Sequence, residues 1–377
     1  MKILYFSPTY SPITHGPALT AQIIANIPSD KHSIEIRMVS ESFEFDIPPN
    51  AYLIDIQINR FFHAWGKWIR MWRYYQKAIE IYKDYPFDYL LFNDALLGFF
   101  SALWWRSSTV QIWGFCNDCA YMSLSSNVNK WKPSFLMECL HAIAECATMK
   151  LADGIFTCSQ SLRNMAMLVY GIKSDKIKCL YPGIHLSFWT YKFRCFKSLG
   201  EMEEILFMKS DYKNGGLLVL LNALNRLSHL SFRLHIAGTP SSQLGNLQIL
   251  LNKYPKLNIV IYGQVSPVKV RELMHQCDML CIPSINEGFG IANIEGLATG
   301  ISVVSSSAGG IPEVLPMDKF GWTVPPNDDT SLARSIEYCW RNKMERSKRS
   351  QAGRAMVELH FTSQQLQEKF IQCIIKN

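Results

Sequence analysis

Long apolar runs, a disulfide framework and low-complexity tracts are all missing from this chain of 377 residues. No stretch approaches the roughly 18 uncharged apolar residues that a membrane-spanning helix needs. The apolar start, MKILYFS, is too short before Pro8 to be a signal peptide. The 11 cysteines lack the spacing of a small secreted disulfide domain. These absences predict a folded protein of the reducing cytoplasm, with no segment that spans a membrane.

Three familiar motif types are absent as well. KILYFSPTYSPITHG has no GxGxxG after the first apolar run, which argues against a dinucleotide-dependent dehydrogenase. No RNP, zinc-finger or helix-turn-helix pattern supports binding to nucleic acid. Cys116 and Cys119 form a single CxxC without a second pair, so free thiols are favoured over a metal or redox site. The formal charge of +7 indicates an anionic partner such as a nucleotide or a membrane surface.

Short apolar runs alternate with helical stretches, and this alternation occurs twice along the chain. The runs of the first half are residues 2–7, 34–39, 89–93, 110–115 and 154–159. Those of the second half are residues 204–208, 232–238, 258–263, 279–284 and 301–306. Strands alternating with helices in this way predict two doubly wound α/β domains with parallel sheets. The irregular segment 178–201 is the predicted linker.

Residues 286–300, NEGFGIANIEGLATG, follow an apolar run and place two glutamates eight positions apart. Glu287 precedes the expected helix, and Glu295 lies about five residues into it, roughly 7–8 Å along its axis. A helix start near Gly290 leaves unpaired N–H groups that suit a phosphate group. Taken singly, each glutamate reads more simply as a solvated or helix-dipole residue. Together, two carboxylates that accept hydroxyl hydrogen bonds on either side of a diphosphate predict a nucleotide sugar as the ligand.

The block INEGFGIANIEGLATGISVVSSSAGGIPEVL (285–315) resembles the signature of glycosyltransferase family 4, which comprises retaining enzymes of the GT-B fold. The similarity covers most of the C-terminal half, including LHIAG, IYGQVSPVKVRELMHQCDMLCIPS and GWTVPPNDDTSLARSI, whereas the first 150 residues match only in outline. The resemblance implies two Rossmann-like domains that face a cleft. On this basis we assign residues 1–187 to an acceptor-side domain and residues 188–357 to a nucleotide-sugar domain. A helix within 358–377 is expected to cross back to the first domain.

By position, the resemblance implies that Glu295 binds the donor ribose and Glu287 the transferred sugar. Val265 would contact the base through its backbone. Four further residues would face the diphosphate or the sugar with their backbone: Gly288, Phe289, Gly290 and Ile291. Gly309, Gly310 and Glu313 form the following turn. No metal cofactor is expected, because the chain has no D-x-D motif, and the acidic pair of NDDTSLA is more simply a helix N-cap.

The family pattern of glycine and arginine after the first strand of the second domain is missing from ILFMKSDYKNGG. Lys209 and Lys213 are therefore the candidate cations for the diphosphate, as point charges without the geometric control of arginine. The resemblance implies a transfer in which the departing diphosphate accepts the acceptor's proton. The protein then supplies positioning and charge stabilisation rather than a dedicated base.

In the first domain, Gly16 stands alone where the family often has a glycine pair, and it is a candidate donor-binding residue because glycine permits close approach to the backbone. His15 beside it is a candidate for the acceptor side. Trp113 occupies the position where the family presents a histidine. Tryptophan can stack on a sugar face but carries no proton, and Asn117 and Asp118 are the nearby polar candidates.

The acceptor side is less specified by the sequence. Segment 60–83 contains six Lys or Arg against one Glu. Trp65, Trp68, Ile69 and Trp72 follow helical spacing and share one face, which either contacts an anionic membrane or packs on the sheet. The preferred hypothesis is a glycosyltransferase that uses a UDP-, GDP- or ADP-linked sugar and a glycan or lipid-linked acceptor in surface polysaccharide biosynthesis (lipopolysaccharide, capsule or exopolysaccharide). A GT-B epimerase and a catalytically degenerate scaffold subunit are the alternatives.

Overall fold

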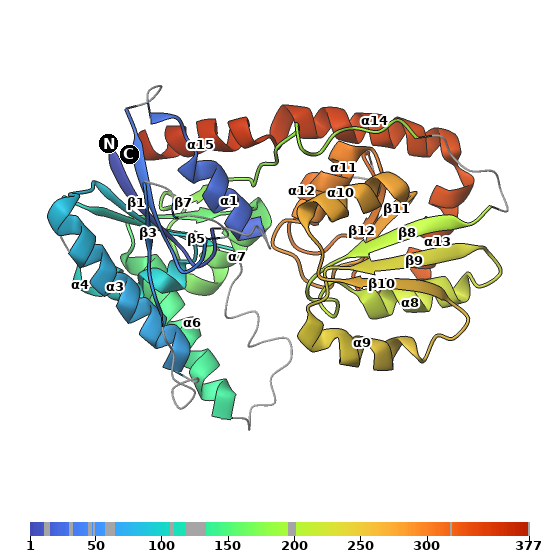
Figure 1. The fold of residues 1–377 in the computed structure, drawn as a ribbon, viewed down its shortest axis with the longest axis horizontal. Helices are drawn as coiled ribbons and strands as arrows, with labels where there is room; N and C mark the ends of the chain where they lie inside the picture. Colours follow the sequence, from blue (N-terminus) through green and yellow to red (C-terminus); the bar gives the residue numbers. More distant parts are fainter. Residues whose placement is uncertain are drawn as a thin grey trace. The chain divides into compact units, whose positions relative to one another are not determined.

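The structure, a computed structural model, describes residues 1–10, 16–29, 33–43, 47, 50–56, 65–105, 109–117, 133–194, 201–316 and 319–375. The chain divides into two compact units, Met1–Gly183 with Gln364–Asn377 and Ile184–Ser363. The boundaries assigned from the sequence fall at 187/188 and 357/358. Each unit is a parallel sheet covered by helices on both faces (Figure 1), which is the doubly wound architecture that the sequence predicts.

The first unit is built on strands that all pair in parallel, in the order β3-β2-β1-β4-β5-β6-β7. Its strands are β1 (Lys2–Ser7), β2 (Glu35–Ser40), β3 (Ala51–Leu53), β4 (Tyr89–Phe92), β5 (Gln111–Cys116), β6 (Gly154–Thr157) and β7 (Ile177–Cys179). The five apolar runs predicted as strands correspond to β1, β2, β4, β5 and β6. The edge strands β3 and β7 were not predicted, since three residues are too few to show a periodic pattern.

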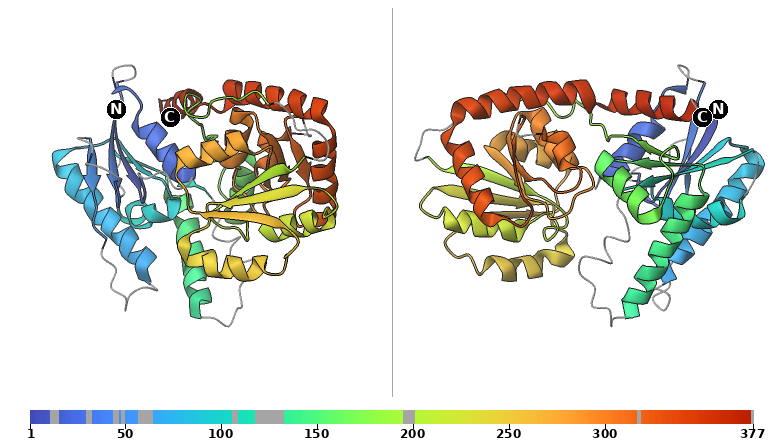
Figure 2. Two further views of the ribbon diagram at one scale, coloured as in Figure 1. Left: turned by 45° about the vertical axis from the view of Figure 1, so that its right-hand side comes forward. Right: turned by 180° about the vertical axis from the view of Figure 1, so that it is seen from behind.

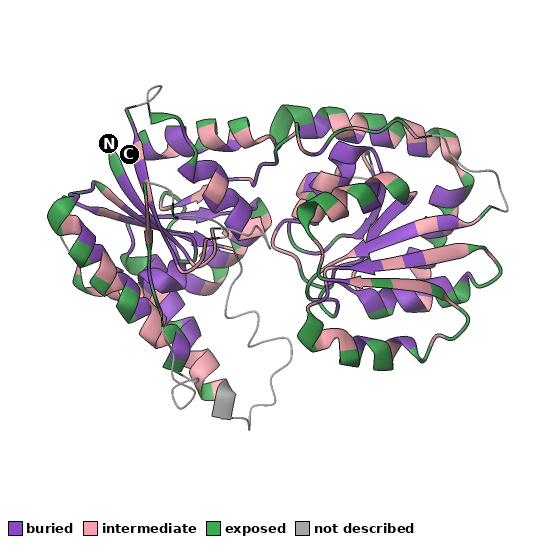
Figure 3. Cartoon of the chain, viewed as in Figure 1, coloured by how far each residue is buried: buried purple, intermediate pink, exposed green. Residues whose placement is uncertain are grey.

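Helices cover both faces of this first sheet. They are α1 (Gly16–Ala25), α3 (Gly66–Asp84), η2 (Ala95–Gly98), α4 (Phe99–Trp104), α6 (Pro133–Leu151), α7 (Gln160–Tyr170) and α15 (Ser363–Ile375). Leu4 and Phe6 pack with residues of α3 and η2. On the opposite face, the ring of Phe156 packs against that of Phe370 of α15, with 5.6 Å between the ring centroids. Burial on both faces explains why the strands read as continuous apolar runs (Figure 3). The last helix thus belongs to the first unit.

The second unit repeats the scheme with the strand order β10-β9-β8-β11-β12-β13. Its strands are β8 (Glu203–Met208), β9 (Phe232–Ala237), β10 (Asn258–Gly263), β11 (Met279–Ile282), β12 (Ser302–Ser306) and β13 (Trp322–Val324). Its helices are α8 (Leu217–Arg226), η3 (Ser241–Gln243), α9 (Leu244–Leu251), α10 (Pro267–Gln276), α11 (Ile291–Thr299), α12 (Ile311–Val314), α13 (Asp329–Arg341) and α14 (Lys343–His360). Helices α8, α9 and α13 share one core with the sheet, and α10, α11 and α14 lie on the other side (Figure 2).

A buried ion pair fastens α14 to the second sheet. Arg346 and Glu203 are each about 2% exposed, and the Arg346 guanidinium donates to the Glu203 carboxylate. The same guanidinium donates to Ser302 Oγ at 3.0 Å and to the carbonyl of Asp278 at 2.8 Å. Because several acceptors surround the buried cation, its desolvation is offset, and removal of either partner would leave a buried charge unpaired.

Helix α3 corrects the expectation for the aromatic part of segment 60–83, of which residues 60–64 lie outside the described residues. The face packed on the sheet consists of Met71, Tyr74, Ala78 and Ile81. Trp68 instead packs against the rings of Phe99, Phe100 and His141. Trp65 and Trp72 are 52% and 40% exposed. The tryptophans therefore do not share one environment, because Trp68 packs against the core of the first unit whereas Trp65 and Trp72 are exposed. No helix in the described ranges is both long and apolar enough to cross a bilayer.

Candidate functional site

The loops after β8 and β11 meet at the carboxyl edge of the second sheet, because these two strands are neighbours. The N–H of Ile285 donates to the carbonyl of Asn214 at 2.7 Å. Gly216 has φ +77°, and a Cβ placed on it would lie 2.0 Å from the carbonyl oxygen of Pro283. Only glycine fits this left-handed position and this close approach of two backbones. The residues of both loops are thus brought together although the sequence separates them widely.

Lys209 and Glu287 form an ion pair at this edge. Lys209 Nζ lies 2.5 Å from Glu287 Oε2, with side-chain exposures of 25% and 15%. Ser284 Oγ donates to the same oxygen at 3.2 Å. Among the described residues, Oε1 of Glu287 has no hydrogen-bond partner. The carboxylate is thus held by one oxygen and open at the other.

Helix α11 begins beside this ion pair without a side-chain cap. Its N-cap, Gly290, has φ +98° and no side chain that could accept from the first N–H groups of the helix. The carbonyl of Gly290 accepts from the N–H of Asn293 at 2.9 Å. Phe289 is 3% exposed, and its ring contacts Phe361 at 5.5 Å, which anchors the loop before the helix. Gly288 and Ile291 are half-buried. The unpaired N–H groups at the start of α11, with the partial positive charge of the helix, suit an anionic group.

Glu295 lies in the second turn of α11 and keeps part of its surface in contact with water. Burial of its carboxyl group raises its pKa from 4.5 to about 8, because the charged form loses hydration. Within the described part of the chain, no hydrogen bond or ion pair to this side chain compensates that loss. An unpaired, half-buried carboxyl group near an uncapped helix start can accept hydrogen bonds from the hydroxyls of a ligand.

The turn of Gly309 and Gly310 supports Glu287 from below. Gly309 has φ +52°, and a Cβ on it would lie 1.7 Å from the carbonyl oxygen of Glu287. The N–H of Gly310 donates to that same oxygen at 3.3 Å. Glu313 lies in the short helix α12 and is half-buried. The two glycines therefore shape the backbone under Glu287.

A set of buried serine hydroxyls was missed by the sequence analysis. Ser306 Oγ donates to the carbonyl of Ser284 at 2.5 Å, and Ser305 Oγ donates to the carbonyl of Ile282 at 2.7 Å. Asn293 Nδ2 of α11 donates to Ser305 Oγ at 3.3 Å. The sequence did contain a signal for them, because serines occur at the ends of the two predicted strands 279–284 and 301–306. These bonds fix the loop that carries Glu287 to β12 and α11.

Lys213 and Val265 are less constrained than Lys209, whose ammonium group is paired with Glu287. Lys213 is exposed, and its backbone N–H donates to Asp211 Oδ1 at 3.1 Å. Val265 is half-buried between β10 and Ser266, which caps α10 by accepting from the N–H of Lys269 at 3.3 Å. No backbone hydrogen bond of Val265 occurs within the described ranges, so its peptide groups are available to a ligand.

The first-unit candidates have a different outcome. Trp113 is 2% exposed, with its ring 4.9 Å from that of Phe156, so it offers no face on which a sugar could stack. Gly16 is the first residue of α1. His15 and Asp118 lie outside the described residues.

A neutral polar cluster occupies the carboxyl edge of the first sheet, and of its members the sequence analysis named only Asn117 as a candidate. The side chain of Asn93 accepts from Tyr5 Oη at 3.0 Å and donates to Ser7 Oγ at 3.0 Å and to the carbonyl of Pro17 at 3.1 Å. Asn117 Nδ2 donates to the carbonyl of Asn93 at 2.6 Å. These bonds order the start of α1 after the first strand.

Asp328 is the N-cap of α13, which agrees with the simpler of the two alternatives for the acidic pair. Its carboxylate accepts from the N–H of Ser331 at 2.8 Å and from Ser331 Oγ at 2.6 Å. These hydrogen bonds lower the pKa of Asp328, because they stabilise its charged form. Within the described ranges, no group of three or more histidine, cysteine, aspartate or glutamate side chains is arranged to hold a metal ion.

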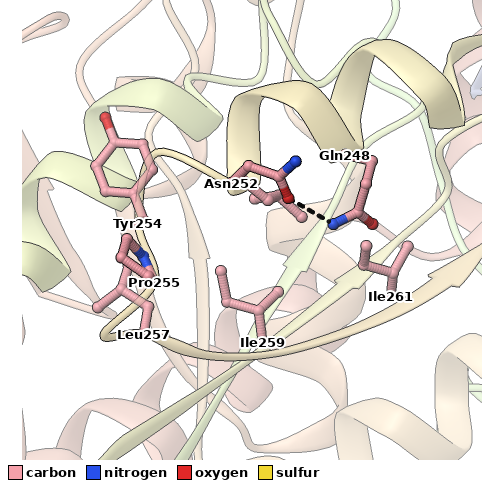
Figure 4. Close-up of a pocket in the computed structure, with 8 residues that line it drawn as sticks. Gln248, Asn252, Tyr254, Pro255, Leu257, Ile259 and Ile261 are labelled. Atoms are coloured by element: carbon pink, nitrogen blue, oxygen red, sulfur yellow. Dashed lines mark hydrogen bonds between the residues drawn. The ribbon is translucent and has the colours of Figure 1, made fainter.

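A cavity of about 460 Å³ lies elsewhere in the second unit, between α9 and the edge strand β10 (Figure 4). Its lining mixes polar and apolar surface, and the amides of Gln248 and Asn252 are hydrogen-bonded to each other at 3.1 Å. None of the residues predicted from the sequence contributes to it. The convergence of charged groups, not this cavity, marks the candidate site.

Comparison with known proteins gives one family match. Residues 194–356 match the family described as glycosyl transferases group 1. An uncharacterized glycosyltransferase, MJ1607 of Methanocaldococcus jannaschii, is 28% identical over 210 residues, covering 52% of this chain and 53% of the relative. The putative colanic acid biosynthesis glycosyltransferase WcaL of Escherichia coli is 31% identical over 175 residues, covering 44% of this chain and 42% of the relative. The chain thus spans about half the length of the curated relatives it matches.

Among solved structures, Alr3699/HepE of Anabaena in complex with UDP and glucose superimposes with a TM-score of 0.77. The alignment covers 100% of both chains at 15% identity. At this identity the similarity establishes the fold and nothing further.

Proposed function

We propose that this chain, whose residues 194–356 match the family described as glycosyl transferases group 1, transfers a sugar from a nucleotide-sugar donor to a glycan or lipid-linked acceptor. The proposal includes retention of configuration at the sugar, no metal requirement, and a role in surface polysaccharide biosynthesis. The observation that carries it is the meeting of the Lys209–Glu287 ion pair, the uncapped start of α11 and the unpaired carboxyl group of Glu295 at one edge of the second sheet.

The donor fits this arrangement from one end to the other. The ribose hydroxyls bind Glu295, the diphosphate lies at the start of α11 near Lys213, and the transferred sugar contacts Glu287. The peptide groups of Val265 are left for the base. Each assignment follows from chemistry: carboxylates accept from hydroxyls, and cations with free N–H groups stabilise phosphate oxygens.

The transfer step needs charge stabilisation more than proton transfer by a side chain. Negative charge grows on the oxygen that links the sugar to the diphosphate as that bond breaks. Lys213 and the N–H groups at the start of α11 stabilise this charge. The departing diphosphate accepts the proton of the acceptor hydroxyl, so the absence of an exposed base at Trp113 is tolerated.

A panel of UDP-, GDP- and ADP-linked sugars, screened by thermal shift, tests donor binding directly. A ligand present at 100 times its Kd stabilises the folded state by about 2.7 kcal/mol. We expect one nucleotide class to raise the melting temperature of the wild type and to lose this effect in Glu295→Ala. If Glu295→Ala retained every shift, the ribose assignment would be wrong.

The same donor separates the alternatives by its products. Release of nucleoside diphosphate with transfer to solubilised membrane glycans supports the glycosyltransferase. Interconversion of the nucleotide sugar with no release would support an epimerase, and binding without any product would support a scaffold subunit.

We further propose that the first unit contacts the inner face of a membrane. Three neighbouring helices, α3, α4 and α6 (Figure 1), expose apolar side chains at 38% to 66%. These side chains, the aromatic surface, are Trp65, Trp72, Ile79, Trp104, Leu136 and Ile143. The ring of Trp72 contacts that of Trp104 at 5.8 Å, and Lys67, Arg73 and Lys83 are exposed on α3. Aromatic side chains beside basic ones match the chemistry of an anionic lipid headgroup region.

Vesicle co-sedimentation tests this surface. We expect binding to vesicles of phosphatidylcholine with phosphatidylglycerol, weaker binding to phosphatidylcholine alone, and loss of both in a Trp72→Ser/Trp104→Ser variant. Leu168→Ser is a matched control, since Leu168 is 86% exposed on α7 but lies outside the aromatic surface. Wild-type self-association that the double variant abolishes would instead identify the surface as a contact between two copies.

A further inference from the structure

We propose that Lys209 and Ser284 are positioning residues for Glu287, which together hold its Oε2 so that Oε1 alone recognises a hydroxyl of the donor sugar. The inference rests on the proposed function and assigns Lys209 a role different from the one expected from the sequence. There, Lys209 and Lys213 were both candidates for the diphosphate.

The contacts of Glu287 are one-sided. Oε2 accepts from Lys209 Nζ at 2.5 Å and from Ser284 Oγ at 3.2 Å. Nothing in the described part of the chain bonds to Oε1, although the side chain is only 15% exposed. Two donors on one oxygen fix the rotation of the carboxylate. The free oxygen is then a single, oriented acceptor.

The path of the Lys209 side chain is built into the second unit. A Cβ on Gly215 would lie 2.8 Å from Lys209 Cγ, so the lysine stem runs directly across this glycine. A Cβ on Gly238, whose φ is +96°, would lie 3.0 Å from the carbonyl carbon of Lys209. The Lys209 N–H also donates to the carbonyl of Ala237 at 3.1 Å. Backbone and stem are both confined, and the ammonium group is directed to Glu287.

Ser284 is equally fixed. It is fully buried, its carbonyl accepts from Ser306 Oγ at 2.5 Å, and its N–H donates to the carbonyl of Ile282 at 2.9 Å. Gly309 meanwhile holds the backbone of Glu287 at a distance that no other residue permits. The acceptor oxygen is thus positioned by groups that do not need a ligand to become ordered.

Lys213 differs from Lys209 in its surroundings, and the two lysines therefore have different roles. It is exposed, and no ion pair of its ammonium group occurs within the described ranges. A lysine that is free can move to a diphosphate, whereas one already paired to a carboxylate must first give up that pair. We therefore assign the diphosphate to Lys213 and the orientation of Glu287 to Lys209.

The oriented oxygen of Glu287 restricts which donor sugars can bind. An ionised carboxylate only accepts hydrogen bonds, so the donor sugar must present a hydroxyl or an amide N–H to Oε1. A deoxy sugar that lacks this group would leave the oriented oxygen unpaired and would be rejected. The sugar, rather than the nucleotide, is what Lys209 and Ser284 help to discriminate.

The test compares UDP with UDP-glucose by calorimetry in Lys209→Met, Ser284→Ala and Lys213→Met. Methionine preserves the stem over Gly215 and removes the charge. For Lys209→Met we expect the affinity for UDP to be unchanged. The ratio of UDP-glucose affinity to UDP affinity should fall about tenfold, because the Glu287 carboxylate that bonds to the glucose is no longer held in one orientation. Ser284→Ala has the same effect in smaller degree, and Lys209→Arg restores part of the loss. Lys213→Met weakens both ligands alike. In turnover, Lys209→Met lowers kcat more than it raises KM.

The opposite pattern overturns the proposal: a loss of UDP affinity in Lys209→Met as large as that in Lys213→Met would make Lys209 a phosphate ligand. A ligand-free measurement separates this failure from failure of the proposed function. Melting temperatures of Lys209→Met, Glu287→Gln and the double variant form a cycle, and we expect a combined loss smaller than the sum of the two. Additive losses would contradict the pairing, whereas a wild type that binds neither UDP nor any other nucleotide would contradict only the function.

Discussion

The carboxyl edge of the first sheet carries a neutral cluster of hydroxyls and amides around Asn93, whereas the same edge of the second sheet carries the Lys209–Glu287 ion pair and an uncapped helix. In the first unit, the polar groups satisfy one another and order the chain near α1. In the second, Glu287 Oε1, Glu295 and the start of α11 are left open. Two units of one architecture thus differ in whether the polar groups at the carboxyl ends of their strands are satisfied within the unit.

The largest expected effect tests what holds the second unit together. Arg346→Met leaves Glu203 buried without its partner, and we expect the free energy of unfolding to fall by about 3–5 kcal/mol in urea titrations. Arg341→Met is the control. Arg341 Nη2 lies 2.8 Å from Glu337 Oε1 in an ion pair that is open to solvent, and such a pair contributes less than about 1 kcal/mol to the free energy of unfolding. Equal losses in both variants would show that burial is not what matters.

The second prediction contrasts the two strand edges. Glu287→Gln keeps the size of the side chain but loses the negative charge that we propose to orient the donor sugar. We expect turnover to fall by about 10²–10³, as when an oriented polar group is removed from an active site. Asn93→Ala, at the same edge of the first unit, lowers the melting temperature but leaves nucleotide affinity unchanged. A loss of nucleotide affinity in Asn93→Ala would break the comparison.

The third prediction concerns Glu295 and pH. The pKa of its carboxyl group is about 8 in the folded state and 4.5 in the unfolded chain. Below pH 4.5 both states hold the proton, and between pH 4.5 and 8 the unfolded chain releases it first, so the wild type loses stability as the pH rises. Glu295→Gln removes this loss. We expect a gain of about 2 kcal/mol at pH 8.5 that disappears at pH 4, with water contact reducing the full effect. Denaturant titrations across this range would contradict the assignment if the gain were independent of pH.

The smallest effect compares one cap in each unit. Ser159 Oγ accepts from the N–H of Leu162 at 3.0 Å at the start of α7, and Asp328 does the same for α13. We expect Ser159→Ala and Asp328→Ala each to cost about 1 kcal/mol in thermal unfolding. Addition of Mn²⁺ should leave the Asp328→Ala difference unchanged, and a metal-dependent difference would revive the acidic pair as a ligand site.

The sequence predicted the central strands of both sheets, the loop that carries Glu287 and the helix that carries Glu295, because apolar runs, glycines and the glutamate spacing are local signals. It could not predict that Trp113 points into the core. The run VQIWGF is buried on both faces, so periodicity does not tell which way a side chain points. The pairing of Lys209 with Glu287 joins residues 78 positions apart and depends on β8 lying beside β11. Ser284 was missed for the same reason, since its role depends on the geometry of the neighbouring loop.

The discontinuous first unit has a consequence for biosynthesis. Phe370 packs on Phe156, and Gln367 Nε2 donates to the carbonyl of Ile23 at 2.7 Å, so residues near the end of the chain complete a core begun near its start. During translation the second unit is whole once residue 363 has emerged, while the first still lacks α15. Since domains fold as units during synthesis, the second unit would reach its native state on the ribosome before the unit encoded ahead of it.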